Sequence, residues 1–408
     1  MKIVIIGAGP AGVSAAETVR AYDHNSKIVM LSAEPYLPYS PPAMADHFLT
    51  GSTLHLWRGR QWPKQLGVDY RRNAEVRWIA PDAHRVELAD GRRVKYDRLV
   101  IATGSRLHAP IEGAAMQGVY NFKSLSAAES IVERVKSGKA KTAVIVGAGF
   151  IGMEIALLFC ELGLEVTQIE MLDQVMATML DKDTAKAALD LMRQRGVKVK
   201  LRTKVKAFVG KRKAKGVQLA SGKILEGDIL IAATGVKPNL DLLEGSGIER
   251  NWGIRVDDHL RTNAPDVYAA GDAVEVPDRL TGETFVHAIF PNAVEQGRVV
   301  GLNLAGYETR YEGGERMNSL KHLGLPIMAV GLKDSDEVLQ EKRNGNLRTI
   351  YLQENRVVGF QLVGDIHAAG ILHSLMLKAS DVRPLKRHLL EPNFGQGMIV
   401  AQAAAAFA

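Results

Sequence analysis

Two apolar runs that lead directly into glycines are the most regular feature of the hydrophobic pattern. They read IVIIGAGPAG at 3–12 and AVIVGAGFIG at 143–152. Short apolar runs next to turn residues are typical of strands buried on both faces. The elements expected after them are helices at 13–22 and 153–163, then strands at 27–31 and 165–169. The pattern therefore predicts the same strand–loop–helix–strand unit twice.

Further buried-strand patterns end in small residues that favour a turn. Two close on Ala-Thr-Gly, at 102–104 and 233–235, and a third closes on Gly-Asp at 271–272. Each of these three strand ends is compatible with a plain turn. Together with the two glycine runs they make five strand ends, and this order of five is not expected by chance. Nearer the C-terminus the pattern predicts two strands around a tight turn at 351–360 and helical stretches at 368–380 and 383–390.

Both glycine runs have the form G-x-G-x-x-G, which has a definite physical use between a strand and a helix. The first glycine allows a tight turn, and the second lets the backbone approach a pyrophosphate. The third lets the helix pack closely on the strand, with its N-terminal N–H groups facing the anion. The sequence therefore predicts two dinucleotide sites, which need not bind the same dinucleotide.

An acidic residue follows each unit where a ribose is expected. Glu34 lies 22 residues after Gly12, and Glu170 lies 18 residues after Gly152. A carboxylate accepts hydrogen bonds from a free 2′-hydroxyl and repels a 2′-phosphate, so the second site should prefer NAD over NADP. The alternative is a glycine turn with an unrelated surface glutamate.

Length and composition limit the class of protein. A chain of 408 residues is expected to form two or three domains, and 46% hydrophobic with 24% charged residues is ordinary for a soluble protein. Gly7 and Gly9 interrupt the first apolar run well short of a signal peptide, and no apolar stretch reaches membrane-spanning length. An apolar tail at 401–408 is compatible with a docked helix or with fraying.

The single cysteine, Cys160, excludes an internal disulfide, a CxxC redox pair and an iron–sulfur cluster held by this chain's own thiolates. It fits a cytoplasmic location. The eleven histidines show no metal-ligand spacing, so no metal site is expected. Cys160 lies in an apolar helical turn, where a packed core residue is expected.

The net charge of +7 makes the chain mildly basic, and the cations are densest at 202–206 and 211–215. One interpretation is a solvated hairpin with long cationic side chains, and another is a docking face for an acidic macromolecule. Nucleic acid is the weakest interpretation, because these residues belong to no nucleic-acid-binding module.

These motifs, with EPYLPY at 34–39 and NAVEQGR at 292–298, resemble the FAD-dependent pyridine nucleotide-disulfide oxidoreductase superfamily. The likeness covers essentially the whole chain, and it lies in the branch of NADH:rubredoxin reductases, ferredoxin reductases, NADH oxidases and nitrite reductase flavin domains. The resemblance implies that the first glycine loop binds FAD and the second binds NAD. It also implies that Asp272 hydrogen-bonds the ribityl or phosphate region of FAD.

The implied fold is α/β, with two Rossmann-like domains for FAD and NAD and a C-terminal α+β interface domain. The FAD domain is expected at 1–112 and 243–316, the NAD domain at 113–242, and the interface domain at 317–408. No catalytic residue is expected. Glu154 resembles the family carboxylate near the nicotinamide, and it is equally compatible with an acid that favours the helix dipole. The expected cofactor-binding residues are Gly7, Gly9, Pro10, Ala11, Gly12, Glu34, Pro35, Val76, Ala102, Thr103, Gly104, Arg106, Gly147, Gly149, Phe150, Ile151, Gly152, Glu154, Glu170, Gly235, Gly271, Asp272 and Phe290.

Absent thiols narrow the implied chemistry. Disulfide reductases of this superfamily carry C-x-x-x-x-C, and coenzyme A disulfide reductases and peroxidase-like oxidases carry one cysteine after E-x-x-x-x-Y. Here the segment at 39–44 reads YSPPAM, so electrons that reach the flavin must leave from the flavin itself. Oxygenase ferredoxin reductases resemble P-Y-x-R-P-x-L-S-K, but Pro41 stands at the Arg position and Asp46 at the Lys position.

The resulting hypothesis is an NADH-dependent flavoprotein. It exchanges a hydride between NAD(H) and FAD, and single electrons between FAD and an acidic iron–sulfur protein or subunit. Alternatives are an NADH oxidase that reduces dioxygen, or the NAD-linked flavin subunit of a larger complex such as phenylglyoxylate dehydrogenase. A homodimer and a hetero-oligomer are both compatible with the sequence.

Overall fold

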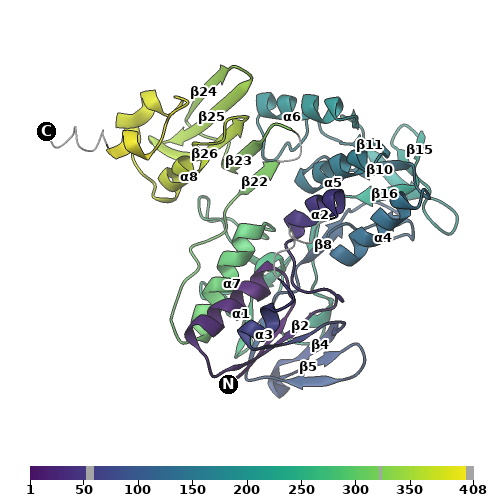
Figure 1. Cartoon of the computed structure of the whole chain (residues 1–408), viewed down its shortest axis with the longest axis vertical. Coiled ribbons are helices and arrows are strands. Elements are labelled where there is room, and N and C mark those ends of the chain that lie inside the picture. The colour runs from purple at the N-terminus through teal and green to yellow at the C-terminus, as the bar shows by residue number, and fades with distance from the viewer. Residues whose placement is uncertain (52–58, 321–323, 401–408) are drawn as a thin grey trace. The chain divides into compact units, whose positions relative to one another are not determined.

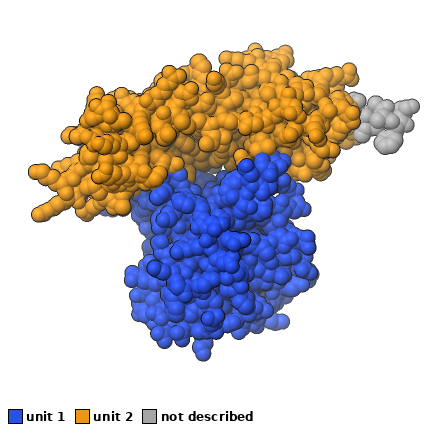
Figure 2. Space-filling view, turned by 180° about the vertical axis from the view of Figure 1, so that it is seen from behind, with its two compact units in different colours: residues 1–108, 121–133, 235–315 blue, residues 109–120, 134–234, 316–408 orange. Residues whose placement is uncertain are grey.

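The computed structural model describes residues 1–51, 59–320 and 324–400, so the expectation for the tail at 401–408 lies outside the described residues. The chain forms two compact units, coloured separately in Figure 2. The described residues of 1–108, 121–133 and 235–315 form the first unit, and those of 109–120, 134–234 and 316–408 form the second.

The first unit is built on a sheet of five parallel strands in the order β19-β7-β1-β2-β3. Ile3, Val4 and Ile5 on the central strand are fully buried, because neighbouring strands and helices cover both edges and both faces. The predicted strand at 27–31 is confirmed. The strands are β1 (Lys2–Ile6), β2 (Lys27–Leu31), β3 (Val68–Arg71), β7 (Arg98–Ile101) and β19 (Val267–Ala269).

Two long helices lie side by side in this unit, α1 (Pro10–Tyr22) and α7 (Phe290–Leu304) (Figure 1). Their close approach depends on glycine. A Cβ added at Gly297 would lie 2.2 Å from the carbonyl oxygen of Ala11, and one at Gly301 would lie 2.5 Å from Thr18 Cβ. The helix predicted at 13–22 begins earlier, at Pro10, because proline fits the first turn of a helix.

Smaller elements complete the first unit. Its short strands are β4 (Val76–Ala80), β5 (Arg85–Leu88), β6 (Arg93–Lys95), β8 (Ser105–His108), β17 (Gly235–Pro238), β18 (Ile254–Arg255), β20 (Val274–Pro277) and β21 (Thr284–Phe285). Its short helices are α2 (Met44–Thr50), α3 (Trp62–Leu66) and the 3₁₀ turns η1 (Pro41–Ala43), η3 (Pro81–Ala83), η4 (Asp241–Leu243) and η5 (Gly271–Ala273).

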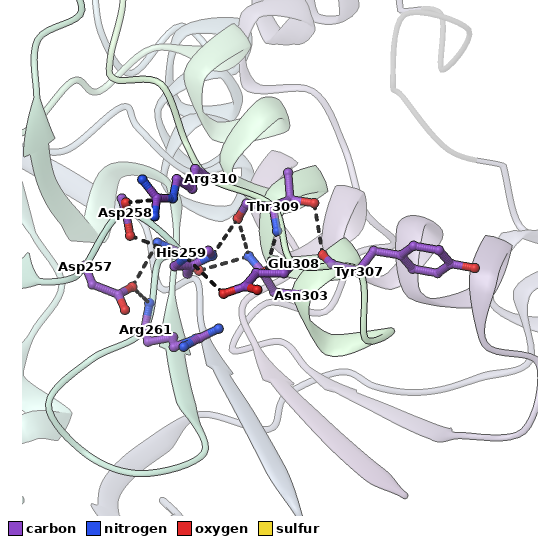
Figure 3. A network of polar contacts seen from close by, with 9 residues as sticks. All are labelled: Asp257, Asp258, His259, Arg261, Asn303, Tyr307, Glu308, Thr309 and Arg310. Atoms are coloured by element: carbon purple, nitrogen blue, oxygen red, sulfur yellow. Dashed lines mark hydrogen bonds and ion pairs between the residues drawn. The ribbon is translucent and has the colours of Figure 1, made fainter.

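A polar network fixes the segment that follows α7 (Figure 3). The side-chain amide of Asn303 donates to the carbonyl oxygens of His259 (3.2 Å) and Thr309 (2.8 Å). The Thr309 N–H donates back to Asn303 Oδ1 at 2.9 Å, and His259 Nδ1 lies 3.0 Å from the Thr309 carbonyl oxygen. The loop at 257–261 therefore holds the C-terminal end of α7 in place.

The second unit repeats the parallel sheet in the order β12-β11-β10-β16-β9. The predicted strand at 165–169 is confirmed, and the helix predicted at 153–163 begins earlier, at Phe150, and ends at Glu161. The elements are β9 (Val119–Tyr120), β10 (Thr142–Val146), β11 (Glu165–Ile169), β12 (Lys198–Lys200), β16 (Ile229–Ala232), α5 (Phe150–Glu161) and α6 (Lys182–Gln194). Helix α4 (Leu125–Lys136) begins in the first unit and ends in the second.

The basic segment forms an antiparallel sheet of β13 (Val205–Val209), β14 (Gly216–Leu219) and β15 (Ile224–Glu226). Lys204, Lys206, Lys211, Arg212 and Lys215 are exposed, as expected for a solvated hairpin. Cys160 departs from expectation. It is half-buried at the end of α5 and not enclosed in the core.

A third sheet in this unit is antiparallel, in the order β22-β23-β26-β25-β24, and helix α8 packs against β26. Glu354 and Asn355, between β25 and β26, have φ of 48° and 61°, which suits a tight hairpin turn. The two predicted strands are confirmed, while the stretch predicted as helical at 383–390 is a 3₁₀ helix. The elements are β22 (Met317–Leu320), β23 (Ile327–Gly331), β24 (Glu337–Arg343), β25 (Asn346–Gln353), β26 (Arg356–Val363), α8 (Ala369–Leu377) and η6 (Arg383–His388).

The α/β fold class agrees with the prediction: two Rossmann-type parallel sheets and a C-terminal α+β part. The compact units do not coincide with the expected domain boundaries. Strand β17 pairs with β8, which brings 235–238 into the first unit, and the segment at 121–133 also groups there. In the part of the chain that is described, no helix is both long and apolar enough to cross a membrane.

Candidate functional site

The first glycine of each G-x-G-x-x-G run forms the same turn in the two units. Gly7 has φ of 106° and Gly147 has φ of 105°, in the region that favours glycine. A Cβ at Gly7 would lie 2.1 Å from the Ala102 carbonyl oxygen, and a Cβ at Gly147 would lie 2.3 Å from that of Ala233. Each turn therefore packs directly on the Ala-Thr-Gly that ends the neighbouring strand.

The third glycine of each run brings the helix against the turn. A Cβ at Gly12 would lie 2.2 Å from the Gly7 carbonyl oxygen, and one at Gly152 would lie 2.4 Å from that of Gly147. Neither contact leaves room for a side chain. The spacing of the glycines thus has the packing role that the sequence predicted.

The middle glycines are different, because a Cβ at Gly9 or Gly149 would meet no atom within 4 Å. Both residues are N-caps, of α1 and α5, and neither helix has a side-chain cap or an acidic residue in its first turn. Pro10 and Ala11 form the first turn of α1, and Phe150 and Ile151 form that of α5. Open space in front of backbone N–H groups fits the pyrophosphate of a dinucleotide at each turn.

Gly271 and Asp272 lie beside the first turn. A Cβ at Gly271 would lie 3.0 Å from Ala11 Cβ, and the Gly271 N–H donates to Oε1 of the buried Gln296 at 2.6 Å. Gln296 belongs to α7, so the packing of α7 on α1 fixes the Gly-Asp turn. The structure thus brings together two motifs that are far apart in the sequence.

Two donors hold the Asp272 carboxylate. Its Oδ2 accepts from Ser105 Oγ at 2.7 Å and from Lys123 Nζ at 2.6 Å, and the lysine and aspartate side chains are 17% and 16% exposed. No described residue hydrogen-bonds the other oxygen, Oδ1, which suits an acceptor for a ribityl hydroxyl. Sequence reasoning missed both donors. Ser105 directly follows Ala-Thr-Gly and could have been found, whereas Lys123 lies in no quoted motif.

Glu34 has protein partners as well as its expected ribose role. Its Oε2 accepts from the Tyr39 hydroxyl at 2.6 Å, and its Oε1 accepts from the Ser126 N–H at 3.0 Å and the Ser126 hydroxyl at 2.7 Å. Burial and the charge of Glu34 raise the pKa of Tyr39, so its phenol remains a donor. A carboxylate offers about four acceptor positions, so a ribose hydroxyl would share Glu34 with these donors.

Thr103 of the first Ala-Thr-Gly and Arg106 just after it bind Asn239 of the second strand–turn pattern. Thr103 Oγ1 donates to the Asn239 carbonyl oxygen at 2.8 Å, and Arg106 donates to Asn239 Oδ1 at 2.9 Å. Arg106 also pairs with Asp241 at 3.3 Å. The side-chain contacts of Thr103 and Arg106 therefore join the segment at 103–106 to the segment at 239–241, a role that the sequence did not predict.

The remaining predicted cofactor-binding residues of the first unit occupy separate elements. Gly104 has φ of 66°, and Gly235 begins β17 opposite His108. Their positions are compatible with a cofactor but do not by themselves indicate one. Of the rest, Ala102 follows β7, Pro35 is exposed after β2, Val76 begins β4 and Phe290 begins α7.

In the second unit Glu170 closes the turn at the end of β11. Its Oε2 accepts from the Ala148 N–H at 2.8 Å, and its Oε1 accepts from the Leu172 N–H at 3.0 Å. The carboxylate is therefore fixed beside the glycine turn, where a ribose is expected. Glu154 is half-buried on α5, beyond its first turn.

Gln168 is a further residue that sequence reasoning missed. It is fully buried on β11, and its Nε2 donates to the Gly147 carbonyl oxygen at 3.0 Å. The strand reads EVTQI, in which Gln168 stands between Thr167 and Ile169, so its pattern carries no clear signal for a buried amide.

The one thiol is poorly suited to redox chemistry. Burial, with a smaller contribution from the charge of Glu161, raises the pKa of Cys160 to about 11. The thiolate is the reactive form, so Cys160 is almost entirely unreactive at neutral pH.

Comparisons with known proteins show what this chain is similar to. Residues 1–297 match the family described as pyridine nucleotide-disulphide oxidoreductase. The chain is 29% identical over 401 residues to an NADH oxidase of Methanocaldococcus jannaschii, covering 89% of this chain and 88% of that one. It is 31% identical over 397 residues to the epsilon subunit of NADH-dependent phenylglyoxylate dehydrogenase of Aromatoleum evansii, covering 94% and 93%.

A solved structure shares both the fold and the extent of the chain. Putidaredoxin reductase, in its covalent complex with putidaredoxin, superposes with a TM-score of 0.86 at 25% identity, and the match covers 99% of each chain.

Proposed function

This chain belongs to the pyridine nucleotide-disulphide oxidoreductase family, and on that premise we propose that it moves electrons between NAD(H) and an iron–sulfur protein or subunit through FAD. It is an NADH-dependent flavoprotein oxidoreductase, with FAD and NAD(H) as its cofactors. A bound flavin takes a hydride and can release electrons singly. The chain's own residues bind and orient the two dinucleotides.

One observation carries the proposal. The fold holds two equivalent glycine turns, each with open space at its middle glycine, and the segment at 39–44 has no thiol. Two dinucleotide sites supply the hydride donor and its acceptor. Without a redox cysteine next to the first site, electrons leave for an external carrier and not for a disulfide of this chain.

Net charge supports an acidic partner. The chain has a net charge of +7, and exposed lysines lie along the β13–β14 hairpin. Opposite charge on a small iron–sulfur protein would speed the encounter. Among similar proteins, putidaredoxin reductase forms a complex with putidaredoxin, and the phenylglyoxylate dehydrogenase relative is a subunit of a larger enzyme. A homodimer or a hetero-oligomer in the reducing cytoplasm fits the single cysteine.

The test compares acceptors at increasing salt. Turnover of NADH with an acidic ferredoxin or rubredoxin should fall steeply as the Debye length shortens from about 30 Å at 0.01 M salt to about 8 Å at 0.15 M. Turnover with an uncharged small acceptor such as menadione is the control and should change little, because salt does not screen its encounter with the chain. Equal salt dependence for both acceptors would contradict steering by an acidic partner. A tightly bound subunit would instead dissociate at high salt.

An NADH oxidase is the second candidate, favoured by the 29% identity to the M. jannaschii NADH oxidase. Oxygen consumption by the isolated protein distinguishes the two. The iron–sulfur proposal predicts that NADH oxidation by dioxygen is much slower than oxidation through an iron–sulfur acceptor. Equal rates would favour the oxidase.

A further inference from the structure

The loop between β11 and α6, at 171–181, connects the candidate NAD(H) site with the C-terminal sheet of the same unit. On one side the Met176 N–H donates to the Ala148 carbonyl oxygen at 2.9 Å. Ala148 is fully buried between the first two glycines of the second turn, and its N–H donates to Glu170. The two backbone groups of Ala148 are thus held by the loop and by the ribose carboxylate.

On the other side, the C-terminal sheet binds the loop at alternate positions. Gln361 on β26 donates through Nε2 to the Met179 carbonyl oxygen and accepts from the Asp181 N–H through Oε1, each at 3.0 Å. Lys333, just after β23, donates to the Ala177 carbonyl oxygen at 2.5 Å. Three backbone groups of the loop are therefore bound by side chains of β26 and of the segment just after β23.

Tyr351 on β25 adds a side-chain contact. Its hydroxyl donates to Asp181 Oδ2 at 2.6 Å, and Asp181 Oδ1 caps α6 by accepting from the Thr184 N–H at 2.7 Å. Burial and the hydrogen bond to Asp181 raise the pKa of Tyr351, so the phenol stays protonated and keeps donating. Gln361 and Tyr351 are only 2% and 3% exposed, which protects these bonds from exchange with water.

We propose that Gln361 and Tyr351 are positioning residues for NAD(H), which hold the loop at 171–181 so that Met176 and Glu170 fix the second glycine turn through Ala148. This role rests on the proposed binding of NAD(H) at that turn. The C-terminal sheet then contributes to dinucleotide affinity without touching the dinucleotide. The chemistry that recognises the ligand remains that of the glycine turn and of Glu170.

The experiment compares two variants of the FAD-loaded chain with a control variant in the same sheet. Gln361→Leu leaves the Met179 carbonyl and the Asp181 N–H without their partner, and Tyr351→Phe removes one oxygen atom. Gln340→Leu is the control, because Gln340 makes its amide hydrogen bond to Thr349 within the same sheet at 3.0 Å. All three should keep the same FAD content and flavin spectrum.

The expected result is local and specific. Gln361→Leu should raise the dissociation constant for NADH about tenfold, and Tyr351→Phe about threefold. Amide hydrogen exchange at 147–149 and 174–181, measured without nucleotide, should accelerate in both variants. Gln340→Leu should change neither the NADH affinity nor the exchange in these segments.

Different results would overturn the positioning role alone or the proposed function as well. Normal NADH affinity and normal exchange in Tyr351→Phe and Gln361→Leu, with a wild-type chain that binds NADH, would overturn the positioning role alone. Equal losses in Gln340→Leu would also overturn it, because the effect would then come from general weakening of the sheet. A wild-type chain that binds no NADH would overturn the proposed function and this inference together. Tyr351→Phe keeps the test decisive if Gln361→Leu does not fold.

Discussion

Single residues set how closely a dinucleotide can approach each turn. The spacing of the glycines predicted the tight turn and the close helix packing correctly, because both follow from local backbone geometry, whereas the approach of a pyrophosphate to the middle glycine stays a prediction. The partners of Asp272 and Glu34 were not predictable in the same way. Lys123 is 149 positions from Asp272, and Ser126 is 92 positions from Glu34. No local pattern records a contact between residues so far apart, so only the folded chain shows them.

Asp272→Ala should weaken FAD binding at least tenfold, which corresponds to about 1.4 kcal/mol. The change removes the acceptor expected for the flavin and leaves the poorly exposed ammonium of Lys123 without its counter-charge. The loss of FAD affinity is measured by the flavin content after purification and by FAD titration of the apoprotein. Asp241→Ala is the control, because Asp241 is 84% exposed and its pair with Arg106 contributes little. Full flavin occupancy in Asp272→Ala would contradict the assignment.

NADH should reduce the flavin at least tenfold more efficiently than NADPH, because a 2′-phosphate would meet the Glu170 carboxylate. Glu170→Arg should shift the preference toward NADPH. Glu170→Gln separates charge from structure, since its amide oxygen can still accept from the Ala148 N–H while the negative charge is lost. This variant should narrow the preference without reversing it. The rates of flavin reduction by NADH and by NADPH, measured by rapid mixing, test this preference. Equal rates for the two nucleotides in the wild-type chain would contradict the argument from the charge of Glu170.

At the scale of elements, apolar runs predicted the strands better than the helices. The strands at 27–31 and 165–169 match the bounds that the sequence pattern predicted, because a short, mostly buried run forms each of them. Helices α1 and α5 begin inside the glycine motifs, at Pro10 and Phe150, where the hydrophobic period has not yet started. The contact of α1 with α7 involves elements from opposite ends of the first unit's sequence and was not expected.

Gly297→Ala should destabilise the first unit, because the new Cβ would lie 2.2 Å from the Ala11 carbonyl oxygen and force α7 away from α1. A cost of about 1–3 kcal/mol is expected, with loss of FAD, since α7 also carries Gln296. Thermal unfolding and flavin content measure both effects. Gly370→Ala is the matched control. It also lies in a helix, its Cβ would meet nothing within 4 Å, and it should be neutral or slightly stabilising. Equal midpoint temperatures of thermal unfolding for Gly297→Ala and Gly370→Ala would contradict the packing argument.

For the whole molecule, the sequence predicted the architecture but not the grouping of segments. Two Rossmann-type sheets and an α+β part were expected from repeated motifs and from a family resemblance. The compact units place 121–133 with the first sheet and group the C-terminal sheet with the second. The hydrogen bonds of Gln361 and Tyr351 to the loop after β11 are among the contacts within the second group. These contacts depend on side chains in strands whose pattern indicated only burial.

The most direct test of the account is anaerobic rapid mixing of the FAD-loaded protein with NADH, followed by an oxidised [2Fe–2S] ferredoxin or a rubredoxin. The account predicts that the flavin absorbance bleaches with one NADH per flavin. The second mixing should restore it while two equivalents of the one-electron acceptor are reduced. A flavin that NADH does not bleach, or a reduced flavin that dioxygen reoxidises as fast as any iron–sulfur acceptor does, would contradict it.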